Sequence, residues 1–166
     1  MSYVDTSVIV AALDPADPRR GRAREALEEE GYKVVSELVL AELASVLSRR
    51  EGLVSDLARR LGLSAELTIV AVLIYLLRRF NLRYRAVEGR ARALPFGKAS
   101  APTAAAVELS AALKLKTLDL LHAAYVKLLR DQGEPLFTLK TADADFKKAE
   151  ERLKRAVGVS VSLIEP

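Results

Sequence analysis

Short apolar segments alternate with longer, helix-like segments along the whole chain of 166 residues. The short segments have the length and the flanking turn residues of buried strands. Strands are expected at residues 2–5, 33–35, 82–87, 136–139 and 157–164. Because helix-like segments separate consecutive strands, the strands are expected to pair in parallel. The sequence therefore predicts an α/β fold in which about four to five short strands form a parallel sheet flanked by helices.

The helix-like segments begin close to small hydroxyl or acidic residues, which are the usual N-caps of helices. Helices are expected over residues 6–13, 19–30, 36–50, 103–115, 117–129 and from 143 onward, with two more between 53 and 80. Ser36, Thr103 and Thr117 are the predicted N-caps, and Gly62 is the predicted break between the two middle helices. Residues 88–102 contain prolines and glycines and are predicted to form a loop.

The size of the chain suits one domain that covers residues 1–166. A helical, apolar segment is expected at about residues 51–105, and its longest apolar run, residues 67–77, is too short to span a bilayer. The N-terminus shows no secretory signal, so we expect a cytoplasmic protein with no membrane segment. Few thermolabile residues together with 29% charged residues predict a thermophilic source.

The residue types that the chain lacks limit its chemistry. There is no cysteine, which excludes disulfides and thiolate metal sites, and there is a single histidine, His122. Zinc sites that need several histidines are therefore excluded within one chain. A bound metal would be held mainly by oxygen atoms, as hard cations such as Mg²⁺ or Mn²⁺ prefer.

Two aspartates follow strand-like segments. Asp5 ends the first strand and is followed by the hydroxyl residues Thr6 and Ser7, and Asp143 follows the strand at residues 136–139. Ligands of open α/β sheets bind beyond the carboxyl ends of the strands, so both residues are candidate metal ligands. Each could equally be an ordinary helix N-cap.

Two further acids lie on otherwise apolar helix faces. Glu42 shares its helix face with Leu38, Val39 and Val46. Burying a carboxylate among apolar residues costs free energy unless the carboxylate is paired, bound to metal or open to a cleft. Asp119 lies in the first turn of its helix, where the helix dipole favours the ionised form. Taken singly, Glu42 could reach solvent or form an ion pair with Arg49, and Asp119 could be an ordinary residue of a helix start.

The combination is more informative than any one acid. Two carboxylates at strand ends and two on helix faces could converge at one edge of a parallel sheet. Like charges so close together repel, and a divalent cation relieves that repulsion. Such a site can activate a water and neutralise the charge that develops when a phosphodiester bond is hydrolysed.

Around these acids the sequence resembles the PIN-domain family. The segments that carry the resemblance, in order, are VDTSVI at residues 4–9, SELVLAEL at 36–43, TLDLLHAA at 117–124 and TADADF at 141–146. Each motif alone is weakly specific, whereas four in this order and spacing cover essentially the whole chain. The resemblance implies a doubly wound parallel sheet.

The resemblance also implies roles for individual residues. Asp5, Glu42, Asp119 and Asp143 would be the catalytic acids that hold Mg²⁺ or Mn²⁺. The auxiliary residues would be Thr6, Ser7, Thr141 and Asp145, with Ser7 holding a metal-bound water and Thr141 orienting a ligand or water. His122 is expected to pack or hydrogen-bond beside Asp119 and not to be a ligand.

The implied activity is cleavage of single-stranded RNA. Among small members of the family, the chain most resembles the VapC-type toxins of toxin–antitoxin pairs, which commonly form homodimers and are inhibited by an antitoxin protein. The apolar helix at residues 67–77 is a candidate surface for a second copy or for an antitoxin. The net charge of +4 and the repeated arginine pairs, among them Arg19-Arg20 and Arg49-Arg50, are compatible with an RNA substrate.

Other functions remain open at the level of the sequence. The chain could be an RNA-processing nuclease, or a catalytically silent PIN-like protein that serves as a binding or scaffold module. A phosphatase of the haloacid-dehalogenase type would use Asp5 as its nucleophile, but such enzymes place a second aspartate two residues later, where this chain has Ser7.

Overall fold

A parallel sheet organises the structure, which is a computed structural model that describes residues 1–89 and 91–166. Its strand order is β3-β2-β1-β6-β7, and every pairing between neighbours is parallel. The strands are β1 (Ser2–Val4), β2 (Lys33–Val35), β3 (Leu82–Tyr84), β6 (Thr138–Thr141) and β7 (Ser160–Leu163). The central strands are buried along their length, as expected for a parallel sheet that is covered on both faces.

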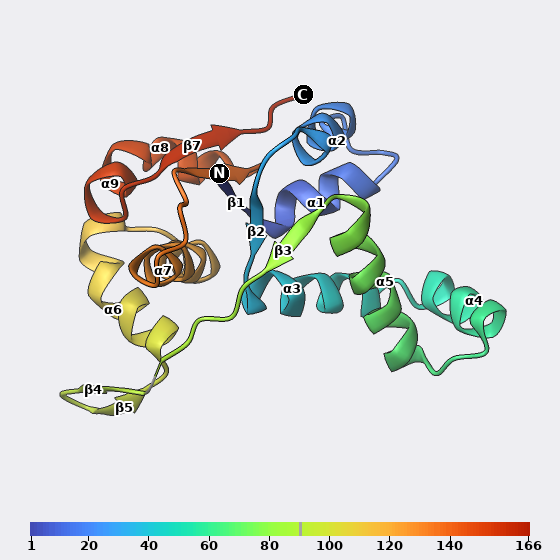
Figure 1. Ribbon diagram of the computed structural model, residues 1–166, viewed down its shortest axis with the longest axis horizontal. Helices are drawn as coiled ribbons and strands as arrows, with labels where there is room; N and C mark the ends of the chain where they lie inside the picture. Colours follow the sequence, from blue (N-terminus) through green and yellow to red (C-terminus); the bar gives the residue numbers. More distant parts are fainter. Residues whose placement is uncertain (90) are drawn as a thin grey trace.

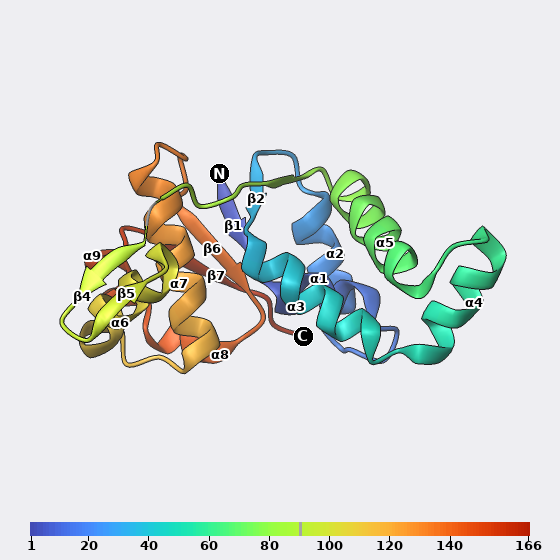
Figure 2. The same cartoon turned by 90° about the horizontal axis from the view of Figure 1, so that it is seen from below.

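Helices cover both faces of this sheet (Figures 1 and 2). On one side are α1 (Thr6–Leu13), α2 (Arg20–Glu28), α3 (Glu37–Ser48), α4 (Glu51–Leu61) and α5 (Ala65–Arg79). On the other side are α6 (Ala101–Leu113), α7 (Thr117–Asp131), α8 (Ala144–Lys148) and α9 (Glu150–Ala156). Right-handed crossovers place helices on opposite faces when the chain reverses its direction across the sheet. The predicted doubly wound α/β fold is therefore confirmed.

The prediction of a loop at residues 88–102 is partly wrong. It contains an antiparallel hairpin of β4 (Arg92–Leu94) and β5 (Gly97–Ala99), which projects from the body of the molecule in Figure 1. Residue 90, which the same prediction covers, lies outside the described residues. The hairpin escaped prediction because its strands have three residues each and lie mostly exposed, so they carry no apolar pattern.

Two predicted N-caps are also corrected. Helix α6 begins after Ser100, whose hydroxyl accepts a hydrogen bond from the Thr103 amide at 3.4 Å, so the cap is not Thr103. Helix α7 begins at Thr117, and its N-cap position is occupied by Lys116. The predicted cap at Ser36 has the correct position, although its side chain makes no capping hydrogen bond.

Strand β6 lies two residues later than the predicted segment 136–139. The sequence obscured it because Lys140 and Thr141 look too polar for a buried strand, yet both are buried. The Lys140 ammonium donates to the Ala26 carbonyl at 2.9 Å and pairs with Glu29, so its charge is compensated below the sheet. The shift matters for function because it puts Thr141 at the end of the strand.

Helices α4 and α5 form an apolar corner at one end of the molecule. With α1 and α3 they enclose a groove of about 480 Å³, which is lined by Leu13, Leu47, Leu57 and Tyr75 among others. Within the part of the chain that is described, no single helix is long and apolar enough to cross a membrane. Helices α4 and α5 meet that criterion only as a pair, bent by 92° at their junction.

Candidate active site

The candidate site lies where the winding of the sheet reverses. Strands β1 and β6 are neighbours at the centre of the sheet, and the helices that follow them cover opposite faces. This is the position at which open α/β sheets bind their ligands. Asp5 directly follows β1 and is 5% exposed. It occupies the N-cap position of α1, but its side chain makes no capping hydrogen bond, which leaves the carboxylate free for other contacts.

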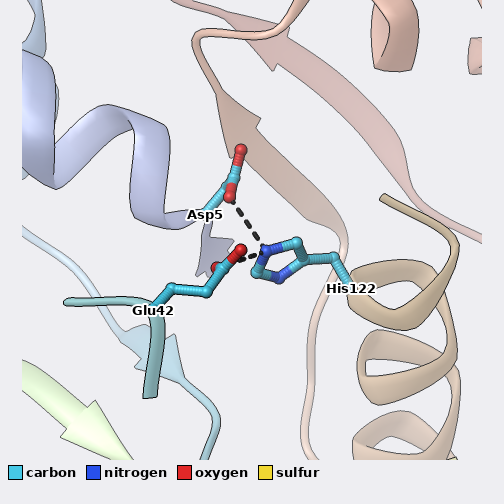
Figure 3. A group of neighbouring side chains, drawn as sticks. All are labelled: Asp5, Glu42 and His122. Atoms are coloured by element: carbon cyan, nitrogen blue, oxygen red, sulfur yellow. Dashed lines mark hydrogen bonds and ion pairs between the residues drawn. The ribbon is translucent and has the colours of Figure 1, made fainter. Parts of the chain in front are cut away.

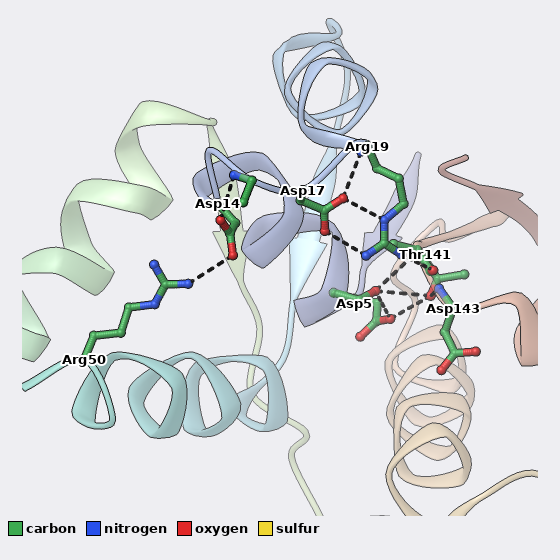
Figure 4. A network of polar contacts seen from close by, with 10 residues as sticks. Asp5, Asp14, Asp17, Arg19, Arg50, Thr141 and Asp143 are labelled. Atoms are coloured by element: carbon green, nitrogen blue, oxygen red, sulfur yellow. Dashed lines mark hydrogen bonds and ion pairs between the residues drawn. The ribbon is translucent and has the colours of Figure 1, made fainter. Parts of the chain in front are cut away.

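Two hydroxyl groups fix the Asp5 carboxylate. Ser7 and Thr141 both donate to Asp5 Oδ2, at 2.6 and 2.7 Å. The same hydroxyls accept from the loop after β6, since Ser7 Oγ receives the Ala142 amide at 2.9 Å and Thr141 Oγ1 receives the Asp143 amide at 3.0 Å. Figure 4 shows Thr141 between Asp5 and Asp143. The start of α1 and the β6–α8 loop are therefore held together through these two residues.

Glu42 reaches the same place from α3. Thr6 donates to Glu42 Oε2, and the imidazole Nε2 of His122 lies 2.9 Å from the same oxygen. Burial raises the pKa of Glu42, but the hydrogen bonds from His122 and Thr6 outweigh it and the pKa is lowered overall. The alternative of an ion pair with Arg49 is not observed, because the Arg49 guanidinium donates to Ser45. Glu42 is thus an ionised acid inside the site.

His122 lies between two acids (Figure 3). Its Nε2 is 3.2 Å from Asp5 Oδ1 as well as 2.9 Å from Glu42 Oε2, and its Nδ1 is 2.8 Å from the Tyr3 hydroxyl. Burial lowers the pKa of His122, whereas the hydrogen bond with Glu42 and the charges of Asp5, Glu42 and Asp119 raise it above its ordinary value in total. The predicted hydrogen bonding is confirmed, but the bridge between Asp5 and Glu42 was missed.

One signal in the sequence could have pointed to this bridge. His122 follows Asp119 by three residues in α7, so both side chains lie on the same helix face. A histidine one turn from a candidate ligand, on a face directed at the sheet, is placed to meet residues from the strand ends.

Asp119 and Asp143 stand near this cluster without a direct hydrogen bond to it. Asp119 Oδ2 is buried and has no hydrogen-bond partner among the described residues. Burial and, after it, the charges of Asp143 and Asp5 raise the pKa of Asp119 to about 6. Asp143 is the N-cap of α8, since its Oδ1 accepts the Asp145 amide at 2.8 Å. The capping interpretation is therefore correct for Asp143, whose other oxygen remains available.

Asp145, the predicted auxiliary acid, is engaged elsewhere. Its two carboxylate oxygens pair with Lys116 and Lys148, each at 2.7 Å. These hydrogen bonds lower the pKa of Asp145 to about 2. The structure therefore gives this carboxylate two lysine partners beside the acid cluster and does not bring it into the cluster.

Arg19, which the sequence marks only as part of the basic pair Arg19-Arg20, contacts the site from outside. Arg19 donates from Nη1 to the Ala142 carbonyl at 2.8 Å. Its Nε and Nη2 donate to the Asp17 carboxylate at 2.9 and 2.7 Å. Figure 4 shows this arrangement beside Asp143. Of the predicted arginine pairs, Arg19-Arg20 thus reaches the acid loop.

The donor set fits a divalent cation. Asp5, Glu42 and His122 offer ligand atoms that all lie within 4.8 Å of one another. The partnerless oxygen of Asp119 and the mutual repulsion among Asp5, Asp119 and Asp143 are the features that a bound cation would relieve. Oxygen atoms dominate the set, as expected for Mg²⁺ or Mn²⁺.

The PIN-domain family model matches residues 2–152 of the chain. The chain belongs to the PIN-domain family. PIN domains are generally nucleases, and the four predicted motifs fall within the matched residues of this PIN domain. Comparison with curated protein sequences gives no significant match.

Solved structures of similar fold include toxins and toxin–antitoxin complexes. VapBC2 from Rickettsia felis, bound to a DNA fragment from its promoter, is similar with a TM-score of 0.57 and 19% identity, over 99% of this chain and 100% of that one. VapC20 from Mycobacterium tuberculosis, a toxin that cleaves the sarcin–ricin loop, has a TM-score of 0.56 and 22% identity, over 90% and 95%. A toxin–antitoxin complex from Klebsiella pneumoniae has a TM-score of 0.52 and 16% identity, over 88% and 90%. At these identities the likeness concerns the fold.

Proposed function

We infer that this PIN domain is a Mg²⁺- or Mn²⁺-dependent endoribonuclease that hydrolyses phosphodiester bonds of single-stranded RNA in the cytoplasm, as the toxin of a toxin–antitoxin pair. The observation that carries the proposal is the convergence of Asp5, Glu42 and His122 at the reversal point of the sheet, with Asp119 near enough for the charges of Asp143 and Asp5 to raise its pKa. Membership in the PIN-domain family and similarity to VapC toxins support the same conclusion.

The proposed roles follow from the contacts. Asp5, Glu42, Asp119 and Asp143 would hold the metal. When bound, the ion would lower the pKa of a water and offset the negative charge that builds up on the phosphate. The hydroxyls of Thr6, Ser7 and Thr141 keep two of these carboxylates in place, since each donates to Asp5 or Glu42. Preorganised ligands need little rearrangement when substrate arrives.

Basic side chains near the acids suit a phosphate backbone. Lys116 and Lys148 flank Asp145 at the rim of the site, and their side chains are 76% and 72% exposed. Exposed lysines contact phosphates without reading the base sequence. We therefore expect RNA affinity to fall steeply with salt, while the fragment ends stay the same.

The decisive experiment compares RNA cleavage by the wild type and by Asp5→Asn. A mixed pool of single-stranded RNA is incubated with Mn²⁺ or Mg²⁺ and, separately, with EDTA. We expect the wild type to cut only with metal and Asp5→Asn to lose at least about 100-fold in rate, because a ligand held by two hydroxyls is removed. Asp56→Asn on α4, the same chemical change far from the acids, should cut like the wild type.

The outcomes separate the candidate functions. Full activity of a folded Asp5→Asn protein, or cutting in EDTA, would contradict the proposal. Metal binding without cleavage of any RNA would instead support a silent PIN-like binding module. Circular dichroism and melting temperature confirm that each variant is folded.

The same proposal includes an antitoxin that occupies the apolar groove between α1, α3, α4 and α5. The groove has an open, apolar lining, and Tyr75 at its edge is 60% exposed. Val46, which lines the groove, lies one turn after Glu42 in α3. A helix bound in the groove could therefore extend along α3 to the acids of the site. Two of the similar structures are complexes of toxin with antitoxin. A homodimer formed through the helix at residues 67–77, which lies within α5, is the alternative proposal for this surface.

A further inference from the structure

The imidazole of His122 lies between Asp5 and Glu42, whereas the sequence predicted only packing or hydrogen bonding beside Asp119. It is 2% exposed, and its Nε2 points between the carboxylates of Asp5 and Glu42 (Figure 3). It is also the only histidine in the chain. Two carboxylate oxygens and one imidazole nitrogen therefore converge at a buried point of the site.

The distances from Nε2 to the two carboxylate oxygens match those between neighbouring ligands of one ion, and all three atoms lie within 4.8 Å of one another. Nε2 lies 2.9 Å from Glu42 Oε2 and 3.2 Å from Asp5 Oδ1. Neighbouring ligands of an octahedral ion with bonds of about 2.1 Å lie about 3 Å apart, because the angle between them is close to a right angle. The three atoms can thus occupy adjacent ligand positions with little movement.

The other side of the ring is held as it is in many histidine ligands of metals. Nδ1 lies 2.8 Å from the Tyr3 hydroxyl, which in turn lies 2.8 Å from Ser36 Oγ. When Tyr3 donates to Ser36 it accepts from Nδ1–H, so a metal that displaces the Nε2 proton would find the Nε2 lone pair directed at the position between the acids. Metal-bound histidines commonly donate their second N–H in this way, which fixes the ring and its tautomer.

We propose that His122 Nε2 is a direct metal ligand beside Asp5 and Glu42, so that the site prefers first-row transition ions such as Mn²⁺ or Co²⁺ over Mg²⁺. The inference rests on the proposed metal-dependent function and narrows the choice of ion. Imidazole nitrogen is a softer ligand than carboxylate, and it favours transition ions, whereas Mg²⁺ favours oxygen ligands alone.

The alternative is that Nε2 stays protonated and donates hydrogen bonds to both carboxylates. His122 would then be a positioning residue. The single histidine allows a test in the unmutated protein. The untagged chain is prepared with ¹⁴N-histidine or ¹⁵N-histidine and loaded with one equivalent of Mn²⁺, and electron spin-echo modulation spectra are recorded. We expect nitrogen modulation in the first sample and its replacement by the ¹⁵N pattern in the second.

The possible results distinguish the proposed ligand role of His122 from the proposed nuclease function. Tight Mn²⁺ binding without histidine nitrogen modulation would overturn the ligand role of His122 and leave the nuclease proposal intact. No Mn²⁺ binding would overturn both. Modulation that follows the isotope label would establish the nitrogen ligand.

Metal selectivity gives a second measurement, by calorimetric titration with Co²⁺ and Mg²⁺. The wild type should bind Co²⁺ at least about tenfold more tightly than Mg²⁺. His122→Gln should lose most of that ratio, because it replaces the nitrogen by an amide oxygen. Glu42→Gln should weaken both ions by similar factors and keep the ratio. Equal loss of both ions in His122→Gln would show a positioning role and overturn the proposal.

Discussion

At the scale of single residues, Asp119 is an acid of the candidate site whose ionised form the fold disfavours. Its Oδ2 is buried without a partner, and burial together with Asp143 and Asp5 raises its pKa to about 6. A carboxyl whose pKa is raised on folding stabilises the fold below its unfolded pKa, and that contribution is lost as the pH rises through the folded value. We therefore expect the contribution of Asp119 to the stability of the metal-free protein to be lost between about pH 4 and pH 6.

We predict that Asp119→Asn stabilises the metal-free protein at pH 7.5 by about 1 kcal/mol, a value discounted for the partial exposure of the group. The variant should also lose the stabilisation that Mn²⁺ gives to the wild type, which should be larger at pH 7.5 than at pH 5. Thermal melts at both pH values, with Mn²⁺ or EDTA, measure this. A destabilised variant, or equal Mn²⁺ effects at the two pH values in the wild type, would contradict the argument.

Thr141 is the second residue with a specific expectation. It is fully buried, donates to Asp5 and accepts from the Asp143 amide. Thr141→Val keeps the shape but removes both hydrogen bonds, so we predict a loss of about 1–3 kcal/mol in stability and about 10–100-fold in metal affinity. The control is Thr138→Val, in the same strand, whose hydroxyl makes only a 3.5 Å contact with Ser160. Equal effects of the two variants on metal affinity would argue against the role of Thr141.

The sequence predicted where Asp5 and Asp143 follow strands and where Glu42 and Asp119 lie on helices, because these are local properties, whereas the roles of these residues as ligands remain predictions. It did not predict the bridge made by His122. That bridge depends on Tyr3 and Ser36, which are 119 and 86 positions away in the chain, and on the packing of α7 against β1. No short-range pattern reports such a contact.

At the scale of secondary-structure elements, the loop between α1 and α2 holds the loop between β6 and α8. Arg19 makes this link through the Ala142 carbonyl, with Asp17 fixing the guanidinium. The connection joins residues 123 positions apart, next to the acid Asp143. It therefore limits the movement of a loop that contributes to the site.

Arg19→Gln should cut this link while keeping a polar side chain. We predict a loss of about 1–2 kcal/mol in stability, because the hydrogen bond to the Ala142 carbonyl and the two hydrogen bonds to Asp17 are lost from a partly exposed ion pair. Faster amide exchange is expected at residues 142–145. The matched control is Arg22→Gln, the same change at an exposed position of α2. Unchanged exchange at this loop in Arg19→Gln would contradict the role of the link.

Long, periodic elements were predicted better than short ones. The helices at residues 36–50 and 117–129 were found nearly at their observed bounds, since a 3.6-residue pattern accumulates over several turns. Strand β6 was displaced because Lys140 is buried only thanks to partners in α2, and the β4–β5 hairpin was missed because it buries little. Each failure has its cause in a tertiary contact or in the absence of one.

At the scale of the whole molecule, the apolar corner of α4 and α5 is the main surface without a partner in the structure of the described residues. We predict that the proposed antitoxin binds there. Tyr75→Glu should weaken that complex at least about tenfold, because it places a charge in an apolar contact. RNA cleavage by the isolated variant should be unchanged.

The control for this prediction is Phe96→Glu in the turn of the β4–β5 hairpin, since Phe96 is 75% exposed and lies away from the groove. It should leave the affinity unchanged. Analytical ultracentrifugation of both variants shows in addition whether the corner joins two copies of the chain. Equal affinities for the three proteins would exclude the groove as the binding surface of that partner.

The pairing of β1 with β6 joins residues 2–4 to residues 138–140. Of the two neighbours of β1 in the sheet, β2 is synthesised early, whereas β6 begins only at Thr138. During synthesis, Asp5 therefore meets Thr141 only after that strand has been made. A fragment of the chain that ends before β6 would lack Thr141 and Asp143, and Asp5 would keep only one of its two hydroxyl partners.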